Sequence, residues 1–348
     1  MDRKFPGESL IFLVSQPRAG STLLQRILAA HPAIDTAAEP WLMLYPLYAL
    51  REHAVTAEFG FRGFRTGLQD FLEAYGGGKA TYLAAVRAWA DVLYGTALHR
   101  GQGRYFLDKT PRYHLIMPDL VQVYPEARYV FLLRNPLAVL RSLKQAFLKE
   151  DYDGLWLFRG DLIDGPTNLL TGIETLGERS CVVHYEGLVT APDETIRRVC
   201  DFLALSYSEE MLEYGDVAAP AGTFGDPVGI HQHSRPVTSS LDKWRQLAMN
   251  DQDRFFALAY LRALGPDVLE RMGYSFAELE QALRANEPVD ARHLIAWETM
   301  LRPPDTWTRR EQLKVARARA LQAYGMGFGT LRFLRENALT LVRTLIPV

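Results

Sequence analysis

The first clear pattern along the chain is an apolar run that ends at Ser15, followed by a Pro- and Gly-containing segment and then by apolar residues at helical spacing over 23–28. An apolar run with Ile and Val predicts a buried strand, Pro and Gly predict a tight loop, and the spacing that follows predicts a helix. Strands are predicted at Ser9–Ser15, Tyr105–Leu107, Tyr129–Leu133 and Cys181–His184, with helical patterns between them. This alternation favours an α/β fold with a mainly parallel sheet flanked by helices, and with ligand sites at the carboxyl ends of the strands.

Changes in composition mark two further parts of the chain. Residues 40–104 are rich in aromatic side chains and contain three consecutive glycines, which predicts a helical cap insertion. The rings of this cap either pack it onto the sheet or line an apolar cleft for a ligand. After an irregular loop over 220–240, the pattern from Phe276 onward is mostly helical. We therefore expect an α/β domain over 1–275 and a helical C-terminal extension over 276–348.

The segment Q-P-R-A-G-S-T at 16–22 has the composition of an anion site. Loop N–H groups and a helix N-terminus attract phosphate. Ser21 and Thr22 add hydroxyl donors, and Arg18 adds a positive charge with forked geometry. Nucleoside triphosphate loops of the form G-x-x-x-x-G-K-[ST] carry a lysine before the hydroxyl residue, whereas Gly20 stands there in this chain. We therefore expect a bound phosphate other than the β/γ pair of a magnesium nucleotide.

A second strand-to-helix junction repeats the theme at R-N-P-L-A-V-L-R-S, residues 134–142. Pro136 is suited to the first helical position, with Asn135 as the N-cap. Arg134 at the end of the strand and Ser142 on the helix can then close on a second anion. Two such sites without metal ligands indicate a nucleotide phosphorylated at two separated places.

The two motifs together, P-R-x-G-S-T and R-N-P-x-x-x-x-x-S, resemble those of sulfotransferases that use 3′-phosphoadenosine 5′-phosphosulfate (PAPS). The resemblance continues through D-K-T-P at 108–111, V-V-H-Y-E-G-L-V at 182–189 and L-D-K-W at 241–244, and covers about residues 8 to 250. The pattern is more similar to tyrosylprotein and bacterial sulfotransferases than to the cytosolic phenol and steroid enzymes. The resemblance implies a P-loop-like sheet, PAPS as co-substrate, no metal, and transfer of the sulfuryl group to a hydroxyl of a hydrophobic small molecule, lipid or phenol.

Sulfuryl transfer needs a base for the acceptor proton, cations for the developing charge, and in-line positioning. Glu39 matches the catalytic glutamate that follows the phosphate loop in the tyrosylprotein enzymes, and Lys109 matches the lysine that contacts the bridging oxygen. The cytosolic enzymes place a catalytic histidine where this chain has Pro111. His114 is therefore the alternative base.

The remaining family positions are implied to bind the nucleotide. They are Arg18, Ala19, Gly20, Ser21 and Thr22 on the 5′-phosphosulfate, Arg134 and Ser142 on the 3′-phosphate, Tyr185 near the adenine, and Ser234 and Lys243 in the segment that closes over the nucleotide. Two departures stand out: the spacing from Ser234 to Lys243 is shorter than in the tyrosylprotein enzymes, and Ala146 replaces their second arginine. Structural roles stay open as well: helix capping for Glu39, solvation for Lys109, ion pairing for Arg134 and core packing for Tyr185.

Composition and charge narrow the function classes. The formal charge of −2 argues against a general nucleic-acid binder. The two cysteines, Cys181 and Cys200, lie in apolar patterns that predict buried thiols rather than a disulfide. Without an apolar signal region or an 18-residue apolar run, we expect a cytoplasmic protein. His231 and His233 have no convincing third partner nearby, so we expect no metal site.

The last part of the chain is basic and apolar at the same time. Residues 307–348 contain eight Arg and Lys and two Glu, a formal charge of +6. Apolar residues at helical spacing form one face: Leu331, Leu334, Ala338, Leu341, Val342 and Leu345. Such a helix either lies on an anionic membrane or a carrier protein that holds a hydrophobic acceptor, or packs against its own domain or a second subunit.

Two other functions stay open at this point. A kinase or another P-loop NTPase is the alternative enzyme, although the chain lacks the lysine of the nucleotide loop. A non-catalytic nucleotide-binding scaffold protein is the alternative outside enzymes, although such a protein does not need Glu39 and Lys109 together.

Overall fold

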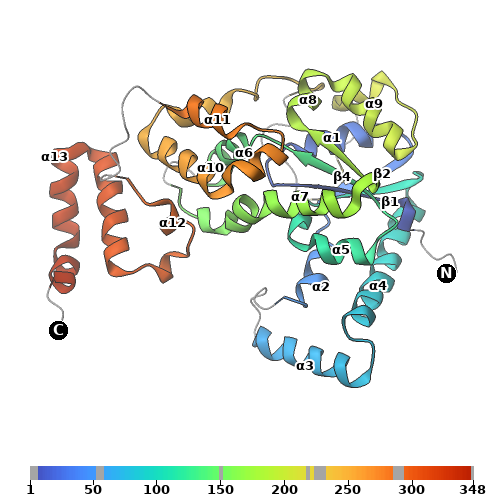
Figure 1. The fold of residues 1–348 in the computed structure, drawn as a ribbon, viewed down its shortest axis with the longest axis horizontal. Helices are drawn as coiled ribbons and strands as arrows, with labels where there is room; N and C mark the ends of the chain where they lie inside the picture. Colours follow the sequence, from blue (N-terminus) through green and yellow to red (C-terminus); the bar gives the residue numbers. More distant parts are fainter. Residues whose placement is uncertain are drawn as a thin grey trace. The chain divides into compact units, whose positions relative to one another are not determined.

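The computed structural model describes residues 7–51, 59–148, 152–216, 220–222, 233–284 and 294–345. Within these residues, five strands form one sheet in the order β2-β3-β1-β4-β5, and every neighbouring pair is parallel (Figure 1). The strands are β1 (Leu10–Ser15), β2 (Ile34–Ala38), β3 (Tyr105–Lys109), β4 (Arg128–Leu133) and β5 (Ser180–His184). The predicted α/β class with a parallel sheet is confirmed.

The central strands owe their position to continuous apolar sequence. All six residues of β1 are buried, and in β4 only Arg128 is partly exposed. Parallel strands covered by helices on both faces show such apolar runs. The edge strand β2 was not predicted. Its sequence I-D-T-A-A contains one buried position, Ile34. Because so short a sequence shows no hydrophobic pattern, the segment is a strand through its pairing with β3.

Helices make up most of the remaining chain. They are α1 (Ser21–Ala29), α2 (Leu44–Tyr48), α3 (Phe61–Tyr75), α4 (Gly78–Arg100), α5 (Met117–Val123), α6 (Pro136–Leu143), α7 (Gly165–Leu176), α8 (Tyr185–Thr190), α9 (Pro192–Leu203), α10 (Asp251–Arg271), α11 (Phe276–Leu283), α12 (Trp297–Met300) and α13 (Arg309–Leu345). Short 3-10 turns join several of them, among them η2 (Pro111–Ile116), η8 (Tyr214–Asp216) and η9 (Lys243–Ala248). In the described part of the chain, no helix is both long and apolar enough to cross a membrane.

The chain divides into two compact units, which we describe separately. The first unit, residues 1–134 and 167–240, contains the sheet, with α1, α8 and α9 on one side of the strands and α4 and α5 on the other (Figure 1). The second unit, residues 135–166 and 241–348, is helical wherever it has regular structure. The expected division at 275/276 stays a prediction.

An aromatic cluster fills the space between the sheet and α4. The ring of Phe12 on β1 contacts the rings of Tyr94, Tyr113, Tyr124 and Tyr129, at centroid distances of 5.3 to 6.3 Å. Tyr94 belongs to the cap helix α4 and is 1% exposed. Part of the cap therefore packs onto the sheet through its rings, which is one of the two expected roles.

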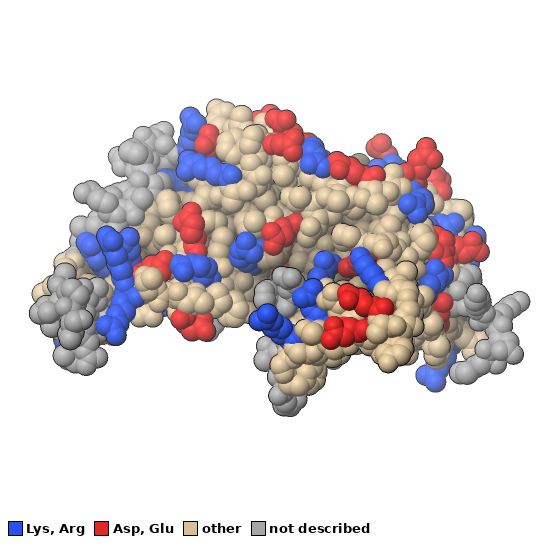
Figure 2. Space-filling view, turned by 60° about the horizontal axis from the view of Figure 1, so that its bottom comes forward, with Lys and Arg blue, Asp and Glu red and all other residues tan. Residues whose placement is uncertain are grey.

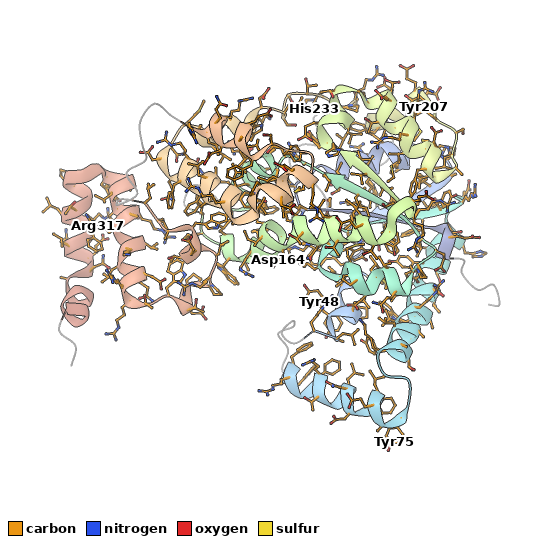
Figure 3. The ribbon with its side chains drawn as sticks, in the orientation of Figure 1. Tyr48, Tyr75, Asp164, Tyr207, His233 and Arg317 are labelled. Carbon is orange, nitrogen blue, oxygen red and sulfur yellow. The ribbon has the colours of Figure 1, made fainter. Side chains whose placement is uncertain are left out.

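Other rings of the cap face solvent. Phe71 and Tyr75 of α3 are 61% and 82% exposed, and Trp89 of α4 is 45% exposed. Tyr75 lies at the end of α3, away from the sheet (Figure 3). The second expected role, an apolar cleft, stays a prediction.

In the second unit, α13 folds back on itself (Figure 1). Phe333 packs in one cluster with Leu313 and Ala320, and a Cβ atom on Gly329 would lie 2.5 Å from the carbonyl oxygen of Ala320. In a straight helix Leu313 and Phe333 would be about 30 Å apart. The basic tail is therefore a helical hairpin rather than a single extended helix.

The two cysteines are free and buried, as predicted. Burial raises the pKa of the Cys200 thiol to about 11. Both side chains therefore belong to the packing of the first unit rather than to its reactive groups.

Candidate active site

The loop between β1 and α1 has a backbone that its residue types permit. Gly20 precedes the helix with φ of 100°, and Arg18 also has a positive φ, 70°. The N–H group of Ala19 donates to the carbonyl oxygen of Gln16 at 3.2 Å, which closes the turn. As the N-cap residue, Gly20 has no side chain that could cap α1. The first N–H groups of a helix lack partners within the helix and carry its positive dipole end. The segment 16–22, which we call the anion loop, therefore has the properties expected of an anion site.

Arg134 and Tyr185, which directly follow β4 and β5, lie against this loop. The Arg134 guanidinium donates from Nη1 to the carbonyl oxygen of Arg18 at 3.0 Å and lies 3.9 Å from the centre of the Tyr185 ring. A Cβ atom on Gly20 would lie 2.5 Å from the same ring, so glycine is required both by the conformation and by the space. The Tyr185 hydroxyl is hydrogen-bonded to Ser240 Oγ at 2.5 Å. The structure thus brings together Arg18, Gly20, Arg134 and Tyr185.

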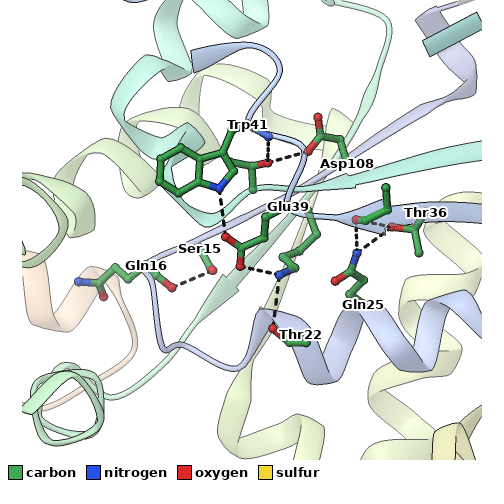
Figure 4. Close-up of polar contacts among 11 residues, drawn as sticks. Ser15, Gln16, Thr22, Gln25, Thr36, Glu39, Trp41 and Asp108 are labelled. Atoms are coloured by element: carbon green, nitrogen blue, oxygen red, sulfur yellow. Dashed lines mark hydrogen bonds and ion pairs between the residues drawn. The ribbon is translucent and has the colours of Figure 1, made fainter. Parts of the chain in front are cut away.

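Glu39, Lys109 and Thr22 form a second group beside the same loop. Figure 4 labels Glu39 and Thr22 of this group. The Lys109 ammonium group donates to Glu39 Oε1 at 2.7 Å and to Thr22 Oγ1 at 3.3 Å. The Lys109 side chain is fully buried, whereas the Glu39 side chain is 17% exposed. The pair therefore combines a desolvated cation with a carboxylate that solvent, and hence a substrate, can reach.

The pairing of β2 with β3 explains this encounter. Ala38, the last residue of β2, lies opposite Lys109, the last residue of β3, so Glu39 follows directly at the end of the sheet. Gln25 of α1 donates to Thr36 Oγ1 at 2.8 Å and to the carbonyl oxygen of Ala37 at 2.9 Å, which ties the helix of the anion loop to β2. The loop and the two charged residues are therefore held by the same strands.

Trp41 holds the second oxygen of the Glu39 carboxylate. Its indole N–H group donates to Glu39 Oε2 at 3.2 Å, and its backbone N–H group donates to Thr110 Oγ1 at 3.3 Å (Figure 4). Thr110 in turn donates to Asp108 Oδ1 at 2.9 Å. Hydrogen bonds thus connect the base candidate to the end of β3.

Asp108 is the buried centre of this support. Its Oδ2 atom accepts hydrogen bonds from the Tyr94 and Tyr113 hydroxyls at 2.6 and 2.8 Å. Burial raises the pKa of Asp108 to about 6, although the hydrogen bonds from both tyrosines and Thr110 and the charge of Lys109 oppose the shift. Burial likewise raises the pKa of both tyrosines well above the ordinary value.

Three further predicted site residues are described by their own surroundings. Ser234 is exposed, and its carbonyl oxygen accepts from the Gly215 N–H group of η8 at 3.1 Å. Ser142, partly buried on α6, and Lys243, exposed at the start of η9, belong to the second unit. Contact of these three with a nucleotide stays a prediction. The Asn135 cap is confirmed, because Asn135 Oδ1 accepts from the Leu137 N–H group at 2.9 Å.

Of the three histidines considered in the sequence analysis, the two that the structure describes differ in their surroundings. His114 is fully buried in η2, and His233 is exposed (Figure 3). His231 lies outside the described residues. Among the side chains that the structure describes, no group of three or more His, Cys, Asp or Glu is arranged to hold a metal ion.

Comparison with known proteins identifies the family. The model of the Sulfotransferase family matches residues 10–209, a segment that includes the anion loop, Glu39, Lys109 and Arg134. The chain belongs to the sulfotransferase family. It is a sulfotransferase enzyme with the P-loop-like α/β fold expected from its motifs.

Relatives of this sulfotransferase come from several sources. It is 31% identical over 290 residues to the nodulation protein NoeE of Sinorhizobium fredii, covering 76% of this chain and 66% of that protein. It is 26% identical to a putative protein-tyrosine sulfotransferase of Caenorhabditis briggsae over 60% of this chain and 70% of that protein. Among solved structures it is similar to the sulfotransferase domain of the Synechococcus PCC 7002 olefin synthase, with 27% identity, a TM-score of 0.51, and coverage of 70% and 90%.

Three contacts of the site were not predicted from the sequence of this sulfotransferase. Trp41 contacts Glu39, Gln25 contacts β2, the strand that precedes Glu39, and Ser240 contacts Tyr185. The E-P-W sequence at 39–41 was the only local signal for Trp41. Gln25 and Ser240 carry no local signal, because the first contact depends on how α1 packs against β2 and the second joins residues 55 positions apart.

Proposed function

We propose that this sulfotransferase moves a sulfuryl group from PAPS to an acceptor hydroxyl, with Glu39 as general base. The observation that carries this proposal is the contact of Glu39 with Lys109 and of Lys109 with Thr22 at the anion loop. It places a carboxylate, a buried cation and a loop hydroxyl at one end of the sheet. These are the groups that an in-line transfer from a phosphosulfate requires.

Each group has a defined task in the transfer. The acceptor oxygen forms a bond to sulfur while the bond between sulfur and the bridging phosphate oxygen breaks. Glu39 takes the proton of the acceptor hydroxyl, and the electron pair of the broken bond stays on the phosphate oxygen of the product 3′-phosphoadenosine 5′-phosphate (PAP). The positive charge of Lys109 stabilises this developing negative charge, together with Arg18 and the N–H groups of the anion loop.

The donor proposal rests on two cationic positions. The segment Arg18–Thr22 would hold the 5′-phosphosulfate at the N-terminus of α1. Arg134 would bind the 3′-phosphate, joined by Ser142, and the adenine would lie near Tyr185, with Ser234 and Lys243 on the closing segment. Lys109, Arg18 and Arg134 supply the positive charge, so the proposal assigns no role to a metal.

Exposure favours Glu39 over His114 as the base. A base has to come within hydrogen-bond reach of the acceptor proton. The His114 side chain is fully buried, whereas Glu39 is partly exposed beside the loop.

For the acceptor we propose a hydrophobic small molecule, a lipid or a phenol, either free or bound to a carrier protein. The exposed rings of the cap, including Phe71 and Tyr75, support an apolar acceptor. The relatives are named as protein-tyrosine sulfotransferases and as a domain of an olefin synthase, which supports a phenol or a carrier-bound chain.

We further propose that the enzyme is cytoplasmic, acts without nucleic acid, and contacts a membrane or carrier through the hairpin of α13, either as a single chain or as an oligomer.

A single-turnover assay with PAPS labelled in its sulfuryl group tests the function. The enzyme in excess is mixed with labelled PAPS and an extract of its source, and the label is followed by mass spectrometry. We expect one PAP for each labelled acceptor. Tight PAP binding without transfer would instead indicate a scaffold protein, and phosphoryl transfer from labelled ATP would indicate a kinase.

A further inference from the structure

Trp41 occupies a position that links the base candidate to the rest of the sheet. Its indole N–H group donates to Glu39 Oε2, while Lys109 donates to Oε1. The two carboxylate oxygens are thus held by donors from different elements. With one oxygen on Lys109 alone, the carboxylate could still rotate about its bond to the side chain, whereas two donors define its plane.

The backbone at Trp41 shows that this arrangement is imposed by its surroundings. Its φ of 54° lies in the left-handed region, which a bulky residue rarely adopts. Such conformations cost about 1–3 kcal/mol each and persist where the surrounding structure holds them. Arg18, in the anion loop, is another of the four non-glycine residues with positive φ in the described part of the chain.

Contacts with the end of β3 keep Trp41 in this conformation. Its backbone N–H group donates to Thr110, and Thr110 donates to the buried carboxylate of Asp108. The Arg112 guanidinium lies 5.7 Å from the centre of the indole ring. A chain of contacts therefore runs from Asp108 through Thr110 and Trp41 to the outer oxygen of Glu39.

We propose that Trp41 is a positioning residue for the general base. Its indole N–H group holds the Glu39 carboxylate in the orientation that accepts the proton of the acceptor hydroxyl, and Thr110 holds Trp41. Trp41 itself exchanges no proton, because the indole group is a donor only. This proposal rests on Glu39 being the base.

A double-mutant cycle separates positioning from a general structural role. Trp41→Phe removes the N–H donor and keeps an aromatic ring, and Glu39→Gln removes the base. We expect Trp41→Phe to slow single-turnover sulfuryl transfer about 10- to 100-fold, the range expected for a misplaced catalytic group. PAP affinity and the acceptor KM should change little. In the Glu39→Gln background, Trp41→Phe should have almost no further effect, because the group it positions is gone.

A matched control and a second variant complete the test. Trp307→Phe removes an indole N–H group that donates to the carbonyl oxygen of Arg302 at 3.0 Å, outside the proposed site, and should leave the rate unchanged. Thr110→Val removes the acceptor for the Trp41 backbone and keeps the indole, so it should slow transfer by a smaller factor, again only when Glu39 is present. If Trp41→Phe does not fold, the Thr110→Val variant tests the positioning role of Trp41 in its place.

The outcomes distinguish the two proposals. A near-normal rate for Glu39→Gln would overturn the base and with it the role of Trp41. A slow Glu39→Gln enzyme with a normal Trp41→Phe enzyme would overturn the Trp41 proposal alone. The same holds if the effects of the two substitutions on the rate simply multiply, because Trp41 would then act independently of Glu39.

Discussion

The two halves of the sheet in the first unit hold their charged residues in different ways. We call them the β2–β3 side and the β4–β5 side. At the ends of β2 and β3, the fully buried Lys109 is paired with Glu39 at 2.7 Å, and Trp41 holds the other carboxylate oxygen. At the ends of β4 and β5, Arg134 is positioned by the ring of Tyr185 and by a carbonyl oxygen of the anion loop.

The difference suggests a division of work. A cation and a carboxylate in contact can move a proton and stabilise a charge during transfer, whereas a guanidinium group on an aromatic ring is suited to binding an anion beside a flat base. We therefore infer that the β2–β3 side governs the rate of transfer and that the β4–β5 side governs the affinity for the nucleotide.

The largest effect is expected on the β2–β3 side. Glu39→Gln should lower kcat by about 10²- to 10⁴-fold, the usual contribution of general-base catalysis, and should leave PAP affinity nearly unchanged. Rapid-quench kinetics and calorimetry measure the two quantities. Glu126→Gln is the control, because Glu126 is also ion-paired in the first unit, with Arg87. Turnover that survives in Glu39→Gln but is lost in His114→Ala would move the base to His114.

The next effect belongs to the β4–β5 side. PAP should bind more tightly than 5′-AMP, and Arg134→Ala should remove most of that preference, because losing charge-assisted hydrogen bonds to a phosphate costs about 1.5–3 kcal/mol. This corresponds to about 10- to 150-fold in Kd, while kcat at saturating donor should change little.

Arg128→Ala is the matched control for this measurement. Arg128 lies at the other end of the same strand and also stacks on a tyrosine, with its guanidinium 5.0 Å from the Tyr105 ring centre. Equal affinities of the wild-type enzyme for PAP and 5′-AMP would contradict the assignment of the 3′-phosphate site.

A third prediction concerns the support beneath the β2–β3 side. Since burial raises the pKa of Asp108 to about 6, the folded protein binds this proton more tightly than the unfolded chain, in which the carboxyl has its ordinary pKa of 3.8. Asp108 should therefore stabilise the fold most at low pH, and this contribution should be lost as pH rises from about 4 to 6. The expected change is on the order of 2 kcal/mol.

Urea unfolding of the wild-type enzyme and Asp108→Asn across this pH range measures the change as a difference between the two proteins. Asp91→Asn serves as control, because Asp91 accepts a hydrogen bond from the Tyr124 hydroxyl but is not fully buried. Parallel stability curves for wild type and Asp108→Asn would show that this carboxyl does not titrate differently in the folded state.

The smallest effect is expected in the second unit, on the hairpin of α13. Lys and Arg side chains gather over this hairpin (Figure 2), and the residues Phe328 and Leu331 are 78% and 68% exposed. Weak sedimentation with anionic vesicles is expected at low salt. It should fall at physiological salt, where charges are screened within about 8 Å.

Two variants test this attachment. The double substitution Phe328→Ser and Leu331→Ser, and a truncation ending near Pro304, should both reduce sedimentation. Tyr75→Ser, which changes an exposed ring of the first unit, should not. If the full chain does not sediment, or if all forms sediment equally, α13 instead serves the packing of the fold or a subunit interface.

Much of the site was predictable because its signals are local. The anion loop follows from the Pro and Gly of 16–22 between an apolar run and a helical pattern, and Asn135 followed by proline indicated the helix cap that the structure confirms. Strand β2 was missed because an edge strand with one buried residue has almost no pattern. The roles of the site residues stay predictions until the variants are measured.

The sequence by itself indicated four of the five strands that the structure describes, the anion loop and the family, because hydrophobic spacing and turn residues act over short distances. Only the tertiary structure decided that Glu39 meets Lys109, 70 residues further along the chain. That contact depends on the pairing of β2 with β3, in which Ala38 lies opposite Lys109. It depends as well on Trp41, whose strained backbone is held by Thr110 from the end of the neighbouring strand. Strand register and long-range hydrogen bonds form only once the sheet is assembled, and no local pattern contains them.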